Sequence, residues 1–289
     1  MTRKGFLAIS SLGFFGICAC GTSSIMKPRK HLGIQLYTVR ESISQNLEKT
    51  LEKLANLGFT QIEIYGYDGK FFGKNRTEFQ TILKNVGLEV ISSHHTTGIV
   101  HNEKGTLLNG WEKSVDDLHY IGAKYMVCSY LFEEERTAEN YRKLPDLLNK
   151  SGEITNLANI DFAYHNHDFE FERFDSTKTI YDFILDNTST SLVKMELDLY
   201  WITKAGFDPL VYFKKYPGRF PLWHVKDMKA DTKDFSEIGN GIIDFKRIFE
   251  ERKLAGLKYW FLEQDSSDKD MFDSISISKK YLDQNSFFF

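Results

Sequence analysis

Polar and ionisable side chains collect at the ends of short apolar segments along this chain of 289 residues. Five of its eight histidines stand at such ends, together with several carboxylates and one lysine. The set comprises Gln35, Tyr37, Glu63, His94, His95, Ser129, His165, Asn166, His167, Glu196, Asp198, His224, Lys226, Asp227, Glu263 and Asp265. Imidazoles and carboxylates that converge on one point form a site for a divalent cation such as Mn²⁺, Zn²⁺, Co²⁺ or Mg²⁺.

The alternation of side chains along a strand narrows this set, because every second residue faces the same side. Glu196 and Asp198 share one face of their segment. Asp198, His224 and Glu263 stand on three successive apolar segments. We therefore expect these three side chains to meet at one divalent metal ion.

A repeated unit positions these residues. An amphipathic helix ends at a glycine, and a short apolar strand follows at once; this occurs at Gly58, Gly87, Gly122 and Gly256. Glycine suits the left-handed position just past a helix end. One helix start is predicted from a capping box over Thr77–Gln80.

The apolar runs predict eight strands, each followed by a helical pattern. They lie near 33–37, 60–65, 88–94, 124–129, 160–165, 192–198, 219–225 and 257–263. Strict alternation of strand and helix favours a parallel sheet, and eight units of this length match a closed barrel. An open doubly wound sheet is disfavoured, because no glycine-rich loop follows the first strand. We therefore predict an α/β fold with a single (β/α)₈ TIM barrel over 32–284 and a C-terminal tail over 285–289.

The N-terminal residues differ in composition from the rest of the chain. A short cationic start precedes an apolar run that ends at Cys20, which is typical of a secretory signal peptide with a lipobox over 1–20. A tether over 21–31 would then connect an acylated Cys20 to the barrel, and the protein would be exported as a cell-envelope or periplasmic lipoprotein. The alternative is an ordinary cleaved signal. Arg3 and Lys4 leave the choice between general and twin-arginine export open.

Charge and cysteine usage exclude some partners. The formal net charge is −3 and no Lys/Arg run occurs, so a nucleic-acid partner is not expected. Membrane contact is expected only through the lipid anchor. The three cysteines provide no disulfide framework. The sequence does not indicate an oligomeric state.

Several motifs together resemble the sugar phosphate isomerase/epimerase family, which has the xylose isomerase-like TIM barrel. They are His165-Asn-His167, Glu196-Leu-Asp198, Trp223-His-Val-Lys-Asp227, the loop 238–245 and Leu262-Glu263. The resemblance implies one metal ion held by residues on the fifth to eighth strands. Asp198, His224 and Glu263 match the family's ligands, and His165 occupies the fifth-strand position where the family has Glu.

The resemblance also implies the chemistry, an isomerisation or epimerisation of a sugar or keto-sugar through an enediolate. Glu263 would be the base, with His167 and Lys226 as further proton-transfer groups. The predicted substrate-binding residues are Glu63, His95, Trp201 and Asp227. Because His165 replaces a carboxylate, β-elimination from a keto-sugar or 3-keto-glycoside is an alternative.

Two alternative functions belong to other classes of protein. A non-catalytic carbohydrate-binding lipoprotein could use the same barrel mouth, but it would not need a strong base beside a metal. The apurinic-site endonuclease branch of the superfamily binds phosphates through several metals, and the acidic balance of this chain disfavours it.

Overall fold

The computed structural model describes residues 31–289. The predicted signal peptide, its Cys20 and almost all of the predicted tether lie outside the described residues. Within residues 31–289, none of the helices has the length and apolar character needed to cross a membrane.

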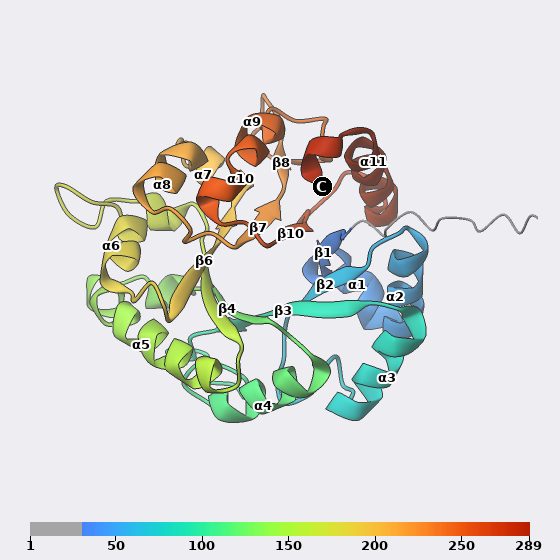
Figure 1. The fold of residues 1–289 in the computed structure, drawn as a ribbon, viewed down its shortest axis with the longest axis horizontal. Helices are drawn as coiled ribbons and strands as arrows, with labels where there is room; N and C mark the ends of the chain where they lie inside the picture. Colours follow the sequence, from blue (N-terminus) through green and yellow to red (C-terminus); the bar gives the residue numbers. More distant parts are fainter. Residues whose placement is uncertain (1–30) are drawn as a thin grey trace, which may run out of the picture.

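Eight parallel strands close into a barrel, which confirms the predicted (β/α)₈ fold (Figure 1). The strands are β1 (Gly33–Gln35), β2 (Gln61–Ile64), β3 (Glu89–Thr96), β4 (Tyr125–Tyr130), β5 (Asp161–His165), β6 (Val193–Asp198), β7 (Leu222–Val225) and β10 (Tyr259–Leu262). Each falls on one of the eight apolar runs of the sequence. The barrel closes where β1 pairs in parallel with β10, through Gly33 opposite Phe261.

The helices form a ring around the strands (Figure 1). They are α1 (Arg40–Gln45), α2 (Leu47–Asn56), α3 (Arg76–Val86), α4 (Trp111–Ile121), α5 (Ala138–Leu157), α6 (Ile180–Asn187), α7 (Leu199–Lys204), α8 (Pro209–Lys215), α9 (Phe245–Glu250), α10 (Arg252–Ala255) and α11 (Met271–Gln284). Their apolar faces and the outward faces of the strands make the large outer core.

The local signals at helix ends are largely as expected. Gly58, Gly87, Gly122 and Gly256 all have positive φ, as the helix–glycine–strand repeat predicts. The capping box of α3 lies two residues earlier than predicted. Asn75 is the N-cap, and its side chain accepts from the backbone N–H of Glu78 while the Glu78 carboxylate accepts from the Asn75 N–H. An Asn side chain caps better than Thr, and so the helix begins there.

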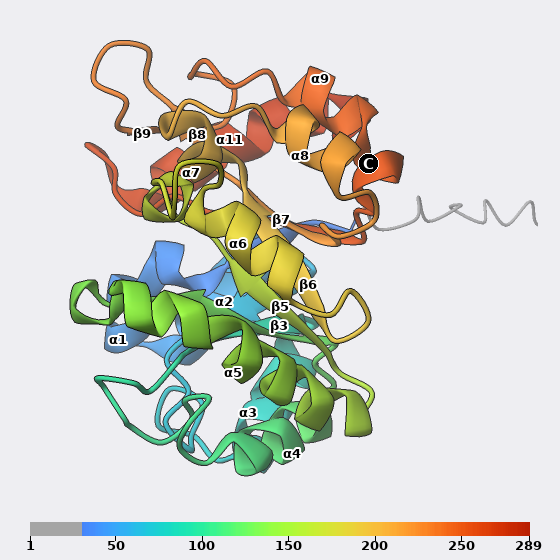
Figure 2. The same ribbon diagram turned by 90° about the vertical axis from the view of Figure 1, so that its left-hand side faces the viewer.

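Two short elements were not predicted. A hairpin of β8 (Asp227–Met228) and β9 (Phe235–Ser236) extends from one end of the barrel, at the opposite end from the C-terminus (Figure 2). The last residues, separated as a tail in the sequence, pack onto the outer core through the 3₁₀ helix Ser286–Phe288. The Phe288 ring is buried, and its carbonyl accepts from Trp260 Nε1 at 3.1 Å.

An apolar layer fills the barrel beneath the site. It consists of Ile91, Tyr125, Val127, Ala163, Leu222 and Phe261. Ala163, Leu222 and Phe261 stand two residues before His165, His224 and Glu263, respectively. Because a strand repeats every two residues, the inward positions change from apolar to ionisable toward the C-terminal end of each strand. The polar site therefore sits on an apolar floor.

Candidate metal centre and the cavity above it

A cavity of about 900 Å³ opens at the C-terminal end of the barrel. This is the end at which (β/α)₈ enzymes place their active sites. Aromatic rings form much of its wall, contributed by Tyr37, Tyr65, Tyr67, Tyr130, Phe132, Phe169, Trp201 and Phe235. Its polar lining includes His94, His95, His165, His167, Lys226, Glu263 and Asp265. The cavity therefore offers apolar faces around a compact ionisable floor.

Four of the lining and floor residues converge on one point, and we call them the upper cluster. They are His165, Asp198, His224 and Glu263, the four metal ligands predicted from the sequence, each offering one atom within 4.8 Å of the others. His224 Nδ1 lies 2.5 Å from Glu263 Oε2 and 3.7 Å from Asp198 Oδ2. All four are buried. The register explains the convergence, because Asp198 lies directly opposite His224 on the neighbouring strand.

The position of the proton on His165 leaves a nitrogen lone pair that faces a carboxylate oxygen of Asp198. His165 Nδ1 lies 3.2 Å from the carbonyl oxygen of Ser129, which can only accept, so Nδ1 carries the proton. Burial lowers the pKa of His165 to about 4, so the imidazole is neutral. Its Nε2 lone pair then faces Asp198 Oδ2 at 3.4 Å. Within residues 31–289 His165 Nε2 has no hydrogen-bond partner, and Asp198 Oδ2 has none beyond its ion pair with Lys226 at 3.1 Å. Two buried acceptors in this arrangement fit a cation between them.

Lys226 is the positive charge beside this cluster. Its ammonium contacts Asp198 Oδ2 at 3.1 Å, Glu263 Oε2 at 2.8 Å and Asp265 Oδ2 at 3.0 Å. Burial alone would lower the pKa of Lys226, but the three carboxylates hold it well above its usual value. In turn, burial alone would raise the pKa of Glu263, and Lys226 and His224 lower it. Glu263 is therefore ionised at the cavity floor.

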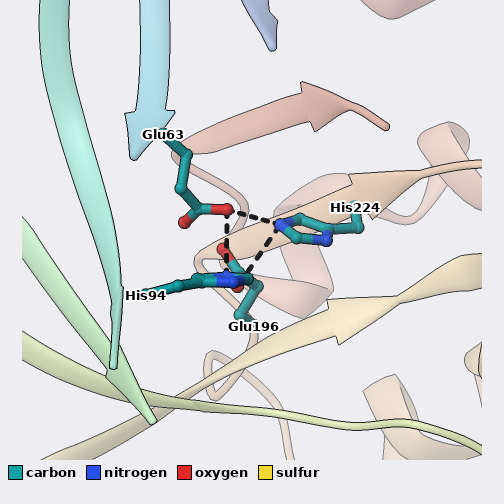
Figure 3. A group of neighbouring side chains, drawn as sticks. All are labelled: Glu63, His94, Glu196 and His224. Carbon is teal, nitrogen blue, oxygen red and sulfur yellow. Dashed lines mark hydrogen bonds and ion pairs between the residues drawn. The ribbon is translucent and has the colours of Figure 1, made fainter. Parts of the chain in front are cut away.

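A second group of four side chains, which we call the lower cluster, meets inside the barrel (Figure 3). It consists of Glu63, His94, Glu196 and His224, and it shares His224 with the upper cluster. His224 Nε2 lies 2.6 Å from Glu63 Oε1 and 3.4 Å from Glu196 Oε2. His94 Nε2 lies 3.1 Å and 2.7 Å from the same two oxygens. His224 thus presents Nδ1 to the upper cluster and Nε2 to the lower one.

The ionisable groups of the lower cluster shift the pKa values of one another. Burial would raise the pKa of Glu63, but His94 and His224 hold it well below the ordinary value. Burial and the neighbouring Glu63 raise the pKa of Glu196. Although burial alone would lower it, Glu63 and Glu196 raise the pKa of His94 to about 9. The imidazoles therefore favour the ionised form of Glu63, and the carboxylates favour protonated imidazoles.

The other predicted site residues divide into lining and supporting roles. His167, His95 and Trp201 line the cavity. The His167 ring stacks on Phe169, and burial lowers its pKa well below the usual value. His95 lies with Nδ1 2.7 Å from the Gly105 carbonyl oxygen, and burial lowers its pKa to about 4. Both imidazoles are therefore neutral hydrogen-bonding groups.

Two predicted substrate-binding residues lie away from the cavity wall. Glu63 is completely buried in the lower cluster, where its carboxylate orients His224. The Asp227 carboxylate accepts from the backbone N–H groups of Met228 at 2.8 Å and Ile243 at 3.2 Å. It also accepts from Gly239 at 2.8 Å and Gly241 at 3.0 Å. Asp227 therefore stabilises the loop that follows β8 and β9 rather than facing the cavity.

Three residues of the site received no role from the sequence. His94 and Glu196 complete the lower cluster, and Asp265 lines the cavity beside Lys226. All three stood among the polar residues at strand ends. Glu196 also shared a strand face with Asp198, and this was the available signal that both point into the barrel. Burial raises the pKa of Asp265 to about 6, despite the opposing effect of Lys226.

Comparison with known proteins identifies the class that this fold and site define. A model of the xylose isomerase-like TIM barrel family matches residues 51–276. The chain belongs to that family, as its motifs implied.

Individual relatives cover most of the chain. An inosose dehydratase of Bacillus cereus (strain AH820) is 24% identical over 271 residues, which span 82% of this chain and 89% of the relative. A crystal structure of a sugar phosphate isomerase/epimerase from Parabacteroides distasonis ATCC 8503 superposes with a TM-score of 0.77 at 27% identity, covering 94% of this chain and 99% of that one. The IolI protein, whose crystal structure holds a zinc atom, has the same fold with a TM-score of 0.70 at 16% identity, covering 88% and 97%. The relatives are enzymes of small sugar-like substrates, both isomerases or epimerases and dehydratases.

Proposed function

We propose that the chain is a divalent-metal-dependent lyase that removes the proton α to the carbonyl of a keto-sugar or cyclic keto-polyol and then expels a β-oxygen substituent. The observation on which the proposal rests is the upper cluster at the cavity floor. There, the Nε2 lone pair of His165 faces Asp198 Oδ2 at 3.4 Å beside the ionised Glu263.

The donor set of the upper cluster fits one divalent ion. Two imidazoles and two carboxylates suit Zn²⁺, Mn²⁺ or Co²⁺, and the lone pair of His165 Nε2 already points into the cluster. His224 is held from behind by Glu63, as metal-binding histidines commonly are. A cation bound by these residues would polarise the substrate carbonyl and stabilise the enediolate charge.

The residues of the chain supply the proton transfers. Glu263 is ionised and lines the cavity, so its carboxylate can take the α-proton. The departing β-oxygen must gain a proton, which the Lys226 ammonium in the same cavity can donate, while the neutral His167 can form a hydrogen bond to that oxygen. With a hydroxyl as the leaving group, the α-proton and the hydroxyl leave as water and a carbon–carbon double bond forms. The aromatic wall favours a substrate with an apolar ring face.

Elimination is favoured over epimerisation by His165. In an epimerase a carboxylate on each side of the carbon exchanges the proton, whereas an imidazole bound to a metal has no free lone pair to accept one. The dehydratase activity of the inosose dehydratase relative points the same way.

Isomerisation or epimerisation is the second candidate, and one residue favours it. Asp265 lines the cavity with a pKa raised to about 6, so it offers a second carboxylate that changes protonation near neutrality. The likeness to the Parabacteroides isomerase/epimerase agrees with this candidate.

The test is incubation of the metal-loaded protein in D₂O with a panel of keto-inositols, keto-sugars and 3-keto-glycosides. Elimination yields an unsaturated carbonyl product that absorbs in the ultraviolet, and epimerisation yields deuterated substrate of inverted configuration. Glu263→Gln is expected to lower turnover by roughly 10²–10⁴-fold or more, because it removes the base and weakens the metal site. Inversion by the wild-type protein that survives Glu263→Gln contradicts both the base and the reaction class. Tight binding of a keto-sugar without turnover would instead indicate a receptor.

We also propose that the chain is exported and acylated at Cys20. The support is the cationic start and apolar run that end at this residue. Mass spectrometry of the native N-terminus tests it. A diacylated or triacylated Cys20 is expected, and an intact Met1 would contradict the proposal.

A further inference from the structure

The proposed elimination uses only His224 of the lower cluster as a metal ligand and Glu63 as its hydrogen-bond partner, yet the whole cluster is built like a site. Glu63, His94, Glu196 and His224 come from four strands, β2, β3, β6 and β7, and each offers one atom within 4.8 Å of the other three (Figure 3). Alternating nitrogen and oxygen atoms form a ring with edges of 2.6, 3.1, 2.7 and 3.4 Å. Such a mixed imidazole and carboxylate set is a typical zinc or manganese environment.

The ring has nearly the size that a small cation requires. Ligands about 2.1 Å from a tetrahedral ion lie about 3.4 Å from each other. The longest edge, His224 Nε2 to Glu196 Oε2, already has this length at 3.4 Å, and the shortest must widen by less than an ångström. Side-chain torsions of Glu63 and His94 suffice for that movement, since both side chains approach the ring from the barrel wall.

Unpaired oxygens mark the lower cluster as incomplete. Both carboxylates are fully buried, and each uses one oxygen in the ring. The second oxygens, Glu63 Oε2 and Glu196 Oε1, have no hydrogen-bond partner within the described part of the chain. Buried carboxylate oxygens normally have partners, because leaving one unpaired costs about 1–3 kcal/mol or more. A cation bound through the ring oxygens would lower this cost by neutralising the charge that each carboxylate shares between its two oxygens.

An ion can reach the ring from the cavity. His94 lines the cavity wall, and its side chain is 12% exposed, whereas the other three members are completely buried. Rotation of this one imidazole therefore opens the ring to the cavity floor.

We propose that the lower cluster is a second divalent-cation site, with His224 as a shared ligand that binds the upper ion through Nδ1 and the lower ion through Nε2. Binding of both ions requires the two ring nitrogens of His224 and Nε2 of His94 to be free of protons, which pass to the solvent, so that His224 becomes an imidazolate. With metal–nitrogen bonds of about 2.1 Å, an imidazolate would hold the two ions roughly 6 Å apart.

The proposal is tested by zinc binding alone, so it does not rest on the proposed reaction. Metal-stripped protein is dialysed against Zn²⁺, and bound zinc is counted by elemental analysis. Two zinc ions per chain are expected in the wild type. Glu196→Gln and His94→Ala should each weaken one of the two sites by more than about 100-fold and leave one ion. Asp198→Asn should also leave one ion, in the lower cluster. Glu135→Gln, which changes another fully buried carboxylate outside both clusters, should retain two.

Anomalous diffraction from zinc-soaked wild-type crystals gives a second readout that needs no variant. Two peaks on opposite sides of the His224 ring are expected, roughly 6 Å apart. A single zinc ion in the wild type overturns the pair of sites, and the variant that removes it shows which cluster holds it. Two ions that persist in Glu196→Gln and His94→Ala place the second ion elsewhere and also overturn the proposal.

Discussion

Removing the charge of Lys226 tests the electrostatics of the upper cluster directly. The Lys226 ammonium contacts the carboxylates of Asp198, Glu263 and Asp265, and its side chain is only 3% exposed. Lys226→Met keeps an unbranched apolar stem but removes this cation. Breaking a buried ion pair by removing one partner costs about 3–5 kcal/mol. In the presence of a chelator, we therefore expect the free energy of unfolding to fall by about that amount.

Metal should reverse the loss, because an ion in the upper cluster would bind the same Asp198 and Glu263 oxygens. A unit charge 4 Å from another contributes about 4 kcal/mol at an effective dielectric of 20. Removing the ammonium therefore relieves repulsion of the ion by a comparable amount. We expect Lys226→Met to bind metal about 10³-fold more tightly than the wild type, since about 4 kcal/mol at 1.4 kcal/mol per factor of ten corresponds to about three factors of ten. With saturating Zn²⁺ or Mn²⁺, its stability should come within about 1 kcal/mol of the wild type.

The assay is urea unfolding of both proteins with chelator and with metal. Lys204→Met is the matched control, because Lys204 lines the cavity with 34% exposure, and its ammonium has a 3.8 Å ion pair to Asp168 and lies 4.5 Å from the centre of the Trp201 ring. It should lose less than about 1 kcal/mol in either condition. An equal loss for Lys226→Met with and without metal would refute the reasoning, since it would show that Lys226 stabilises the fold independently of any ion.

Three further predictions concern single side chains. His165→Glu should shift the D₂O assay from elimination toward deuterated, inverted substrate by restoring a second carboxylate, and loss of elimination with no deuterium exchange would argue against this role. Asp227→Asn should lower the free energy of unfolding by about 3 kcal/mol. Each carboxylate oxygen of Asp227 accepts two backbone N–H groups, and the substitution replaces one of these oxygens by an amide donor. A loss below 1 kcal/mol in urea unfolding would contradict this prediction. Burial raises the pKa of Glu170 to about 7, above its unfolded value, so its contribution to stability is present at acidic pH and is lost as pH rises toward and through 7. Unfolding free energies measured from pH 4 to 8 should therefore converge with those of Glu170→Gln at low pH and separate by up to about 3 kcal/mol above 7, whereas parallel curves would contradict the shift.

The barrel was predictable from local sequence because each unit repeats the same signals. Helix, positive-φ glycine and apolar strand recur, and the strand alternation places His165, Asp198, His224 and Glu263 at the inward end of four neighbouring strands. The resemblance to the family supplied the grouping of these four. Their convergence thus follows from topology, without knowledge of loops.

The lower cluster could not be predicted in the same way, because it joins opposite sides of the barrel. Glu63 and His224 are 161 positions apart, and their contact depends on the tilt and stagger of strands in the closed barrel. Sequence also could not separate His94 from the adjacent His95, of which only the first joins the lower cluster. The position of Asp227 was not predictable for a similar reason, since its amide partners lie up to 16 residues away in a loop without a regular pattern.

The direction of the strands determines which end of the barrel lies nearest to the proposed lipid anchor. Leu32 and β1 begin at the end opposite the cavity, and the β8–β9 hairpin lies at the far end of the molecule from the C-terminus (Figure 2). On the proposed acylation of Cys20, the chain between the lipid and Leu32 is about a dozen residues, which spans at most roughly 40 Å when extended. The lipid would therefore be attached at the end of the barrel opposite the cavity, so that the anchor itself leaves the mouth open to soluble substrates.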